Sequence, residues 1–145
     1  MKLLLRPGLY LMLLGLFTLT SANADEPIPP RFPALQITTD QWKAYLAEVK
    51  ALPDVQCMED RINQLTCNSS EQHTIWVFTT PGHPAHPAVS RGVIVMQQTA
   101  KGATVSIDRS GHYAGHRAEF DVWMRQFAML DRTQVAQWQS SLKGK

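Results

Sequence analysis

The segment 73–80, which reads HTIWVFTT, constrains the fold of this chain more than any other. β-Branched and aromatic side chains occupy both alternating sets of positions, so a strand formed here presents apolar residues on both of its faces. Such a strand needs cover on two sides and belongs in the interior of a sheet. The rest of the chain is therefore expected to supply neighbouring strands and helices packed on the sheet.

Three more segments have the alternation or the β-rich composition of strands, and turn-forming residues separate them. They are residues 62–67, 91–98 and 103–108. Short turns and one longer loop join the four predicted strands, which favours an antiparallel meander.

Before and after the predicted strands, apolar residues recur at the spacing of a helix. A helix is expected over 40–52, because Thr38 and Gln41 have the spacing of a capping box and Pro53 closes the pattern. After the strands, two apolar stripes at helical spacing predict two helices, with a break at 131–133 where Asp131 can cap the second one. The predicted fold class is α+β, with an N-terminal helix, a four-stranded antiparallel meander and two C-terminal helices packed on the sheet.

The N-terminus has the pattern of a secretory signal peptide, which predicts cleavage after residue 24 and a periplasmic or secreted protein. Lys2 and Arg6 precede an apolar run at 9–19, and Ala22-Asn23-Ala24 provides the cleavage site. The apolar run is shorter than the ~20 residues that a membrane span needs, so no stable span is expected after cleavage. Residues 25–37 form a proline-rich extended lead-in, and 38–145 form a single α+β domain.

The charge balance gives no support for nucleic-acid binding. The full chain has 14 Lys and Arg against 12 Asp and Glu. Lys2 and Arg6 are the only charged residues of the predicted signal peptide, so the mature chain is expected to be neutral. Nucleic acids and anionic membranes are bound through basic patches, and a neutral surface with interspersed signs lacks that signature.

Cys57 and Cys67 are the two cysteines of the chain, and their pairing as a disulfide is predicted. An even number of cysteines in a chain exported to an oxidising compartment favours a disulfide, and nine intervening residues do not fit a C-x-x-C redox pair. Closing this short loop would stabilise the fold by roughly 3 kcal/mol on the chain-entropy account.

Four of the five histidines fall in two close pairs: His83 with His86 in GHPAHP, and His112 with His116 in GHYAGH. An antiparallel meander carries the chain to the same end of the sheet after its second and fourth strands. Both pairs are therefore expected at one rim of the sheet, about 10 Å apart at the usual strand spacing.

One interpretation of the rim is a Zn²⁺ or Cu²⁺ site formed by all four histidines, or by three of them and a water molecule. The prolines after His83 and His86 oppose it, because they hold each histidine extended, where nearby side chains diverge. The alternative is that GHPAHP is a stiff connector between strands and GHYAGH a glycine-rich turn.

A second interpretation is a hydrolase or phosphoryl-transfer enzyme in which two facing histidines act as general acid and base. Arg91, Arg109 or Arg117 would stabilise an anion, and Asp108 or Glu119 would orient an imidazole. The sequence contains no nucleophile elbow and no H-E-x-x-H motif, so no complete catalytic constellation supports this hypothesis.

The leading interpretation is a small, exported, non-enzymatic binding or inhibitor protein that acts through rim loops 81–90 and 109–116. A disulfide-tied domain without a complete active site fits this class, since recognition residues usually lie on loops of a rigid scaffold. The expected partner is a protein or another cell-envelope component. The candidate contact residues are His83, His86, Tyr113 and Arg91.

Overall fold

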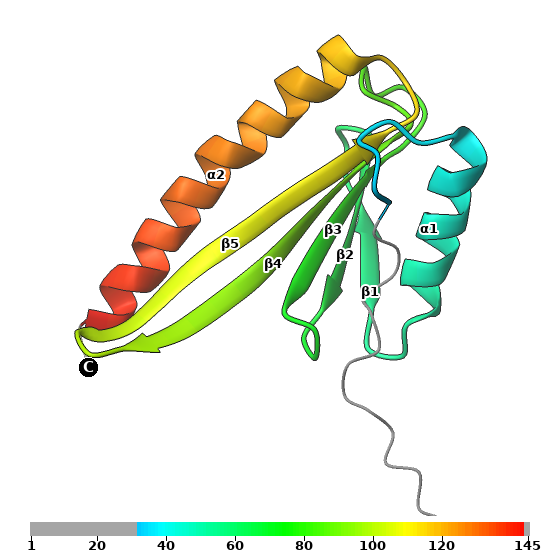
Figure 1. Ribbon diagram of the computed structural model, residues 1–145. Helices are drawn as coiled ribbons and strands as arrows, with labels where there is room; N and C mark the ends of the chain where they lie inside the picture. The colour runs from blue at the N-terminus through cyan, green and yellow to red at the C-terminus, as the bar shows by residue number, and fades with distance from the viewer. Residues whose placement is uncertain (1–31, 144–145) are drawn as a thin grey trace, which may run out of the picture.

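The computed structural model describes residues 32–143, which form an α+β fold with a five-stranded antiparallel sheet and one helix on each of its faces (Figure 1). The predicted signal peptide 1–24 and residues 25–31 of the lead-in lie outside the described residues. The strands follow one another across the sheet in chain order. In chain order the elements are α1 (Thr39–Ala51), β1 (Gln56–Glu59), β2 (Gln64–Ser69), β3 (Thr74–Thr79), β4 (Ala88–Thr99), β5 (Gly102–Tyr113) and α2 (Arg117–Lys143).

β3 lies in the middle of the sheet, between β2 and β4, as its apolar sequence predicts. Trp76 and Phe78 are fully buried on the face that α1 covers, in one core cluster with side chains of that helix. Val77 belongs to a second cluster on the opposite face, together with side chains of α2. Burying a large apolar side chain stabilises a fold by about 1.5–3 kcal/mol, so β3 supplies much of the energy that holds both helices on the sheet.

The N-terminal helix is confirmed close to its predicted bounds. Thr38 and Gln41 form the expected capping box, in which each side chain bonds the other residue's backbone N–H. The helix ends at Ala51, one residue before its cap and two before Pro53. Its buried residues are Trp42, Tyr45 and Val49.

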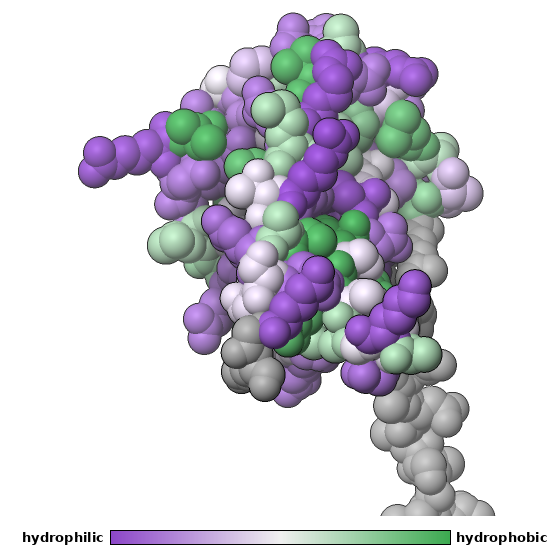
Figure 2. Space-filling view, turned by 90° about the vertical axis from the view of Figure 1, so that its left-hand side faces the viewer, coloured by the Kyte–Doolittle hydropathy of each residue, from purple (hydrophilic) through white to green (hydrophobic). Residues whose placement is uncertain are grey.

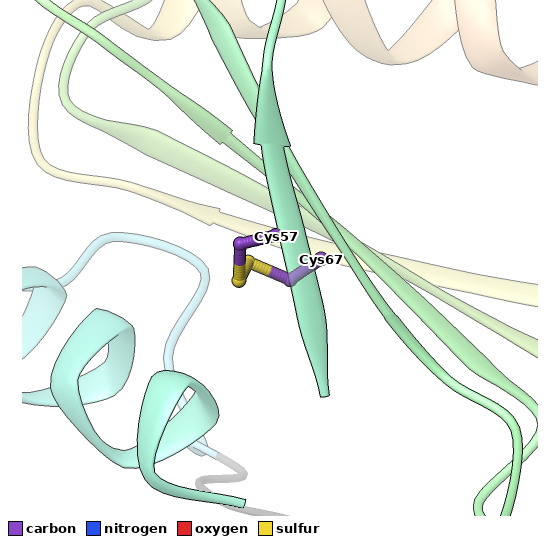
Figure 3. The surroundings of a disulfide bond; sticks show 2 residues. All are labelled: Cys57 and Cys67. Atoms are coloured by element: carbon purple, nitrogen blue, oxygen red, sulfur yellow. A yellow bond between two sulfur atoms is a disulfide. The ribbon is translucent and has the colours of Figure 1, made fainter. Parts of the chain in front are cut away.

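The predicted number of strands was too small by one, because β1 has no recognisable pattern. All four of its residues are exposed, so no alternation of apolar and polar positions marks it in the sequence. β1 is held in place by pairing with β2, in a register that sets Cys57 opposite Cys67. These two cysteines form the predicted disulfide, on the side of the strands that faces α1 (Figure 3). A disulfide fits an oxidising, exported environment.

β4 and β5 are longer than predicted, and they form a hairpin that extends beyond the other strands (Figure 1). Pairing between β3 and β4 stops at Thr74 opposite Val93. The Ile94 N–H still donates to the His73 carbonyl at 2.8 Å, and from Val95 to the turn after Thr99 β4 pairs only with β5. We call residues 94–107 the arm. At the other end, residues 88–90 and 109–113 belong to the strands, so the predicted rim loops are shorter than expected.

The two predicted C-terminal helices are a single helix, α2, of 27 residues. At 1.5 Å per residue it is about 40 Å long, which matches a strand of twelve residues, and it runs along the β4–β5 hairpin (Figure 1). The predicted break was wrong because Asp131 does not cap a helix. Its carboxylate instead pairs with Arg109 of β5, with the Arg109 Nε to Asp131 Oδ2 distance at 2.9 Å.

Arg109 lies between the sheet and α2 and contacts both. Its guanidinium donates two hydrogen bonds to Asp131 and a third to the Ser90 hydroxyl at 3.2 Å, and it stacks over the Phe127 ring at 4.6 Å. Gly92 leaves the space for it, since a Cβ there would lie 2.7 Å from the guanidinium carbon. The planar, bidentate geometry fixes the position of α2 along β5.

The described part of the lead-in packs against the edge of β5. Gln36 forms a parallel bridge with Tyr113, and the Ile37 N–H donates to the Tyr113 carbonyl at 2.9 Å. The Tyr113 N–H donates in turn to the Leu35 carbonyl at 3.2 Å. Near the arm, the Gln139 side chain of α2 bonds the Ala103 carbonyl and the Val105 N–H. Both ends of this strand edge are therefore covered.

The surface on the α2 side is mainly hydrophilic, with smaller hydrophobic areas between the polar side chains (Figure 2). Neither described helix has the length and apolar character that crossing a bilayer requires.

Replacing Cys57 and Cys67 with serine together should lower the free energy of unfolding by about 3 kcal/mol, because the unfolded chain regains the freedom that the cross-link removes. Chemical denaturation of oxidised wild-type protein and the double variant measures this difference. Reduced wild-type protein is the control and should match the variant. Equal stability of the oxidised and reduced wild type would contradict the prediction.

Asp131→Asn should destabilise the protein by about 2 kcal/mol, since it leaves the largely buried Arg109 guanidinium without its counter-charge. The matched control is Asp121→Asn, also on α2, which breaks the exposed pair of Asp121 with Arg117. That change should alter stability by less than about 0.5 kcal/mol. Equal midpoints for the two variants in urea denaturation would contradict a special role for the Arg109 pair.

Candidate functional site

The two histidine segments meet at one end of the sheet, as the meander predicts. We call residues 80–87 the rim segment. Its Pro87 carbonyl accepts hydrogen bonds from the backbone N–H groups of Ala114 and Gly115, at 2.8 and 3.2 Å. The contact is close enough to require glycine, because a Cβ at position 115 would lie 2.6 Å from the His86 carbonyl oxygen.

The rim segment is fixed at both ends and along its length. At its base the Thr79 hydroxyl accepts from the Ala88 N–H at 2.8 Å and donates to the Ala88 carbonyl at 3.1 Å. Within it, the His83 N–H donates to the Thr80 carbonyl and the His86 N–H donates to the His83 carbonyl, at 3.1 and 3.0 Å. Two successive turns thus replace the flexible loop that the length of the segment would allow.

His86 and His112 are directed towards the α1 side of the sheet. The Nδ1 of His86 lies 2.9 Å from the Thr79 carbonyl oxygen, and its ring packs edge-on against Trp42. The Nδ1 of His112 lies 2.9 Å from the Ala34 carbonyl oxygen. A carbonyl only accepts hydrogen bonds, so both Nδ1 atoms carry a proton and act as donors. Each imidazole therefore holds two parts of the backbone together.

His83 is directed towards the opposite face and packs against α2. Its Nδ1 accepts from the Ala85 N–H at 3.1 Å, so the proton of the neutral ring is on Nε2, which lies next to the Gln64 amide. The ring also packs against Trp123, with centroids 5.5 Å apart. Burial lowers the pKa of His83 and the neighbouring His86 lowers it further, while the Asp60 carboxylate raises it.

The remaining candidate residues differ in exposure. His116 is exposed just before α2, and its carbonyl accepts from the Phe120 N–H. Tyr113 is only 6 % exposed, with its ring against Phe120, and Arg91 is 9 % exposed. Burial leaves little of Tyr113 and Arg91 for a partner, so their predicted role as contact residues stays a prediction without structural support.

The four-histidine metal site also stays a prediction. Within residues 32–143, no group of three or more His, Cys, Asp or Glu side chains lies close enough together to hold a metal ion. His83 packs on one side of the rim, whereas His86 and His112 pack on the other. Nor does an acid/base pair with an arginine gain support, because Arg109 is bound to Asp131 and Arg117 lies near Asp121.

A recess of about 310 Å³ opens where the rim segment meets α2 and the β1–β2 turn. We call it the rim groove. It combines apolar side chains with amides and a carboxylate, and Ile62 and Val122 at its border are 63 % and 44 % exposed. Its lining residues are Ile62, Gln64, His83, Pro84, Glu119, Val122, Trp123 and Gln126.

Most residues of the rim groove were not among the predicted contacts. His83 was predicted from its motif, whereas Ile62 was expected at the start of a strand. One signal in the sequence was available, since Ile62 precedes Asn63, a residue that tolerates the positive φ of 60° seen in this turn. Connecting segments run over the surface of a protein, and Ile62 is 63 % exposed there.

No protein-family model, curated protein or solved structure matches this chain.

The pKa of His83 should lie below its usual value of 6.5. The unfolded chain then binds this proton more tightly than the folded chain, so stability should fall as the pH is lowered from 6.5 towards the folded pKa. NMR titration of the His83 ring measures the pKa directly. In denaturation experiments, His83→Gln should flatten this part of the pH dependence, with pH 8 as the reference where the imidazole is neutral. A His83 pKa at or above 6.5 would contradict the prediction.

Proposed function

We propose that this protein is a small, exported, non-enzymatic binding or inhibitor protein that captures a protein or cell-envelope partner at the rim. The observation that carries the proposal is a preformed rim segment beside an open groove. Residues 81–90 and 109–116, partly loop and partly strand, provide the framework, and the accessible contact surface is His83, Pro84 and the rest of the rim groove.

Rigidity of the rim segment supports recognition of a partner. Thr79 closes its base, and His83 and His86 each bond the backbone within or beside it. Ordering a flexible loop on binding costs conformational entropy, and a loop that is already ordered avoids most of that cost. The rim segment is thus better suited to recognition than an unstructured loop of the same length.

The composition of the rim groove supports a protein partner. Apolar side chains at its border, among them Ile62 and Val122, alternate with the amides of Gln64 and Gln126 and the carboxylate of Glu119. Mixed surfaces of this kind are typical of non-obligate interfaces, which are no more apolar than the rest of a protein surface. An extended segment of a partner protein matches these residues if it places an apolar side chain in the rim groove and hydrogen-bond donors beside the amides and the carboxylate.

Ile62→Glu and Val122→Glu, made separately, should each weaken partner capture by at least about tenfold, because each places a charge in an apolar part of the contact. The bait is the mature, oxidised protein, incubated with an extract of the exporting compartment. Captured proteins are quantified by mass spectrometry against a wild-type bait.

The matched control is Met129→Glu, on the same helix as Val122 and 69 % exposed, outside the rim groove. It should capture the same partner as wild type. All three positions are exposed, so the variants should remain folded, which circular dichroism verifies. Capture that is unchanged in Ile62→Glu and Val122→Glu, or lost equally in Met129→Glu, would refute binding at the rim groove.

A further inference from the structure

A second recess lies where the arm meets the last turns of α2. This is the end of the β4–β5 hairpin opposite the rim (Figure 1). We call this recess the arm groove, and its volume is about 340 Å³. The arm is only two strands wide, so the arm and α2 do not fully bury the apolar side chains that lie between them. Met96 of the arm is therefore 64 % exposed. The lining residues are Ile94, Met96, Val105, Trp138, Ser141 and Leu142.

The lining of the arm groove is apolar almost throughout. Its one hydroxyl group belongs to Ser141 and already donates to the Gln137 carbonyl of the same helix at 3.1 Å. The other five residues contribute aliphatic, thioether and indole surface. An occupant would therefore be held by apolar contact, and a polar or charged group placed inside would lose its hydration without compensation.

The charged residues of the arm and of the last twelve residues of α2 are all basic, and the nearest acidic residues along the chain are Asp108, just past the arm, and Asp131. Residues 94–107 and 132–143 contain three charged residues. These are Lys101 in the hairpin turn, Arg132 and Lys143. The nearest acidic residue on α2, Asp131, is paired with Arg109. An anionic group at the mouth of the groove would meet favourable charge on more than one side.

The arm groove has the size of a small-molecule site. Its volume falls at the lower end of the range of about 300–1,000 Å³ that is usual for small-molecule sites. One aliphatic chain fits these limits.

From these features we propose that the arm groove binds the hydrocarbon chain of a free anionic amphiphile of the fatty-acid class. The chain lies against Met96, Val105 and Trp138, and the carboxylate remains in solvent near Lys101 and Lys143. This site is separate from the rim groove and does not depend on the function proposed for it.

Dodecanoate, below its micelle-forming concentration, is the probe for the mature, oxidised protein. Calorimetry should show saturable binding, and Trp138 should report it as a change in fluorescence. Trp138→Phe should remove that fluorescence change while the heat of binding remains. Dodecyltrimethylammonium, which has a similar chain and the opposite charge, should bind at least about tenfold more weakly.

Met96→Glu should weaken dodecanoate binding by at least about tenfold, because it puts a carboxylate beside the chain and near the ligand's own charge. The matched control is Met58→Glu on β1, where the methionine is 76 % exposed and lies outside the arm groove. That variant should bind as wild type does. The double variant Lys101→Glu/Lys143→Glu should bind more weakly, with a reduced dependence on salt.

Two results would overturn the proposal. The first is the absence of saturable dodecanoate binding by folded wild-type protein; if phosphatidylglycerol vesicles are bound in that case, the basic arm is assigned to a membrane surface instead. The second is equal dodecanoate binding by Met96→Glu and Met58→Glu.

Discussion

Burial of β3 on both faces is the constraint on which the rest of the structure depends. Trp76 and Phe78 are covered by α1, and Val77 on the other face is covered by α2. Neither helix can be lost without exposing one side of this strand to water. The loss of a large buried side chain costs about 3–5 kcal/mol, comparable with a large part of the stability of a small domain. The meander places β3 in the centre, so both helices and the two strands on either side are organised around it.

The rim and the arm follow from this organisation in different ways. The rim segment continues directly from β3, and Thr79, the last residue of that strand, closes its base. It therefore takes its rigidity from the core. The arm lies beyond the end of β3. It is supported mainly by α2, through Arg109 near its start and Gln139 further along. The rim end of the sheet is consequently held firmly by the core, whereas the arm end has apolar surface that the fold does not fully cover.

Local sequence patterns were sufficient to predict the elements in which the order of apolar and polar residues reflects which side chains are buried. The capping box of α1, the interior position of β3, the disulfide and the arrival of both histidine segments at one rim are all confirmed. β1 was missed because an exposed strand of four residues has no alternation to detect. The predicted break in α2 was wrong because the partner of Asp131 is Arg109, 22 residues away in sequence. An aspartate that caps a helix and one that pairs with a distant arginine look the same in the sequence.

The candidate site was predictable only in part, for a related reason. Topology brought His83 and His86 to the rim, but the direction of each ring depends on which face offers it a partner. His83 meets Trp123 of α2, and His86 meets Trp42 of α1. The rim groove also draws on Ile62, Gln64 and Gln126, whose local sequence contains no motif. Its residues come from separate segments, and only the folded structure shows that they meet.

The proposed function depends on a rigid, preformed rim segment, and amide hydrogen exchange of the oxidised protein measures that rigidity. The N–H groups of Ala85, His86 and Ala88 are hydrogen-bonded within the segment or to its base. They should exchange slowly, on a scale closer to the amides of β3 than to those of the hairpin turn at the end of the arm. Exchange of these three amides as fast as in that exposed turn would contradict the proposal, because a mobile segment would not present a preformed binding surface.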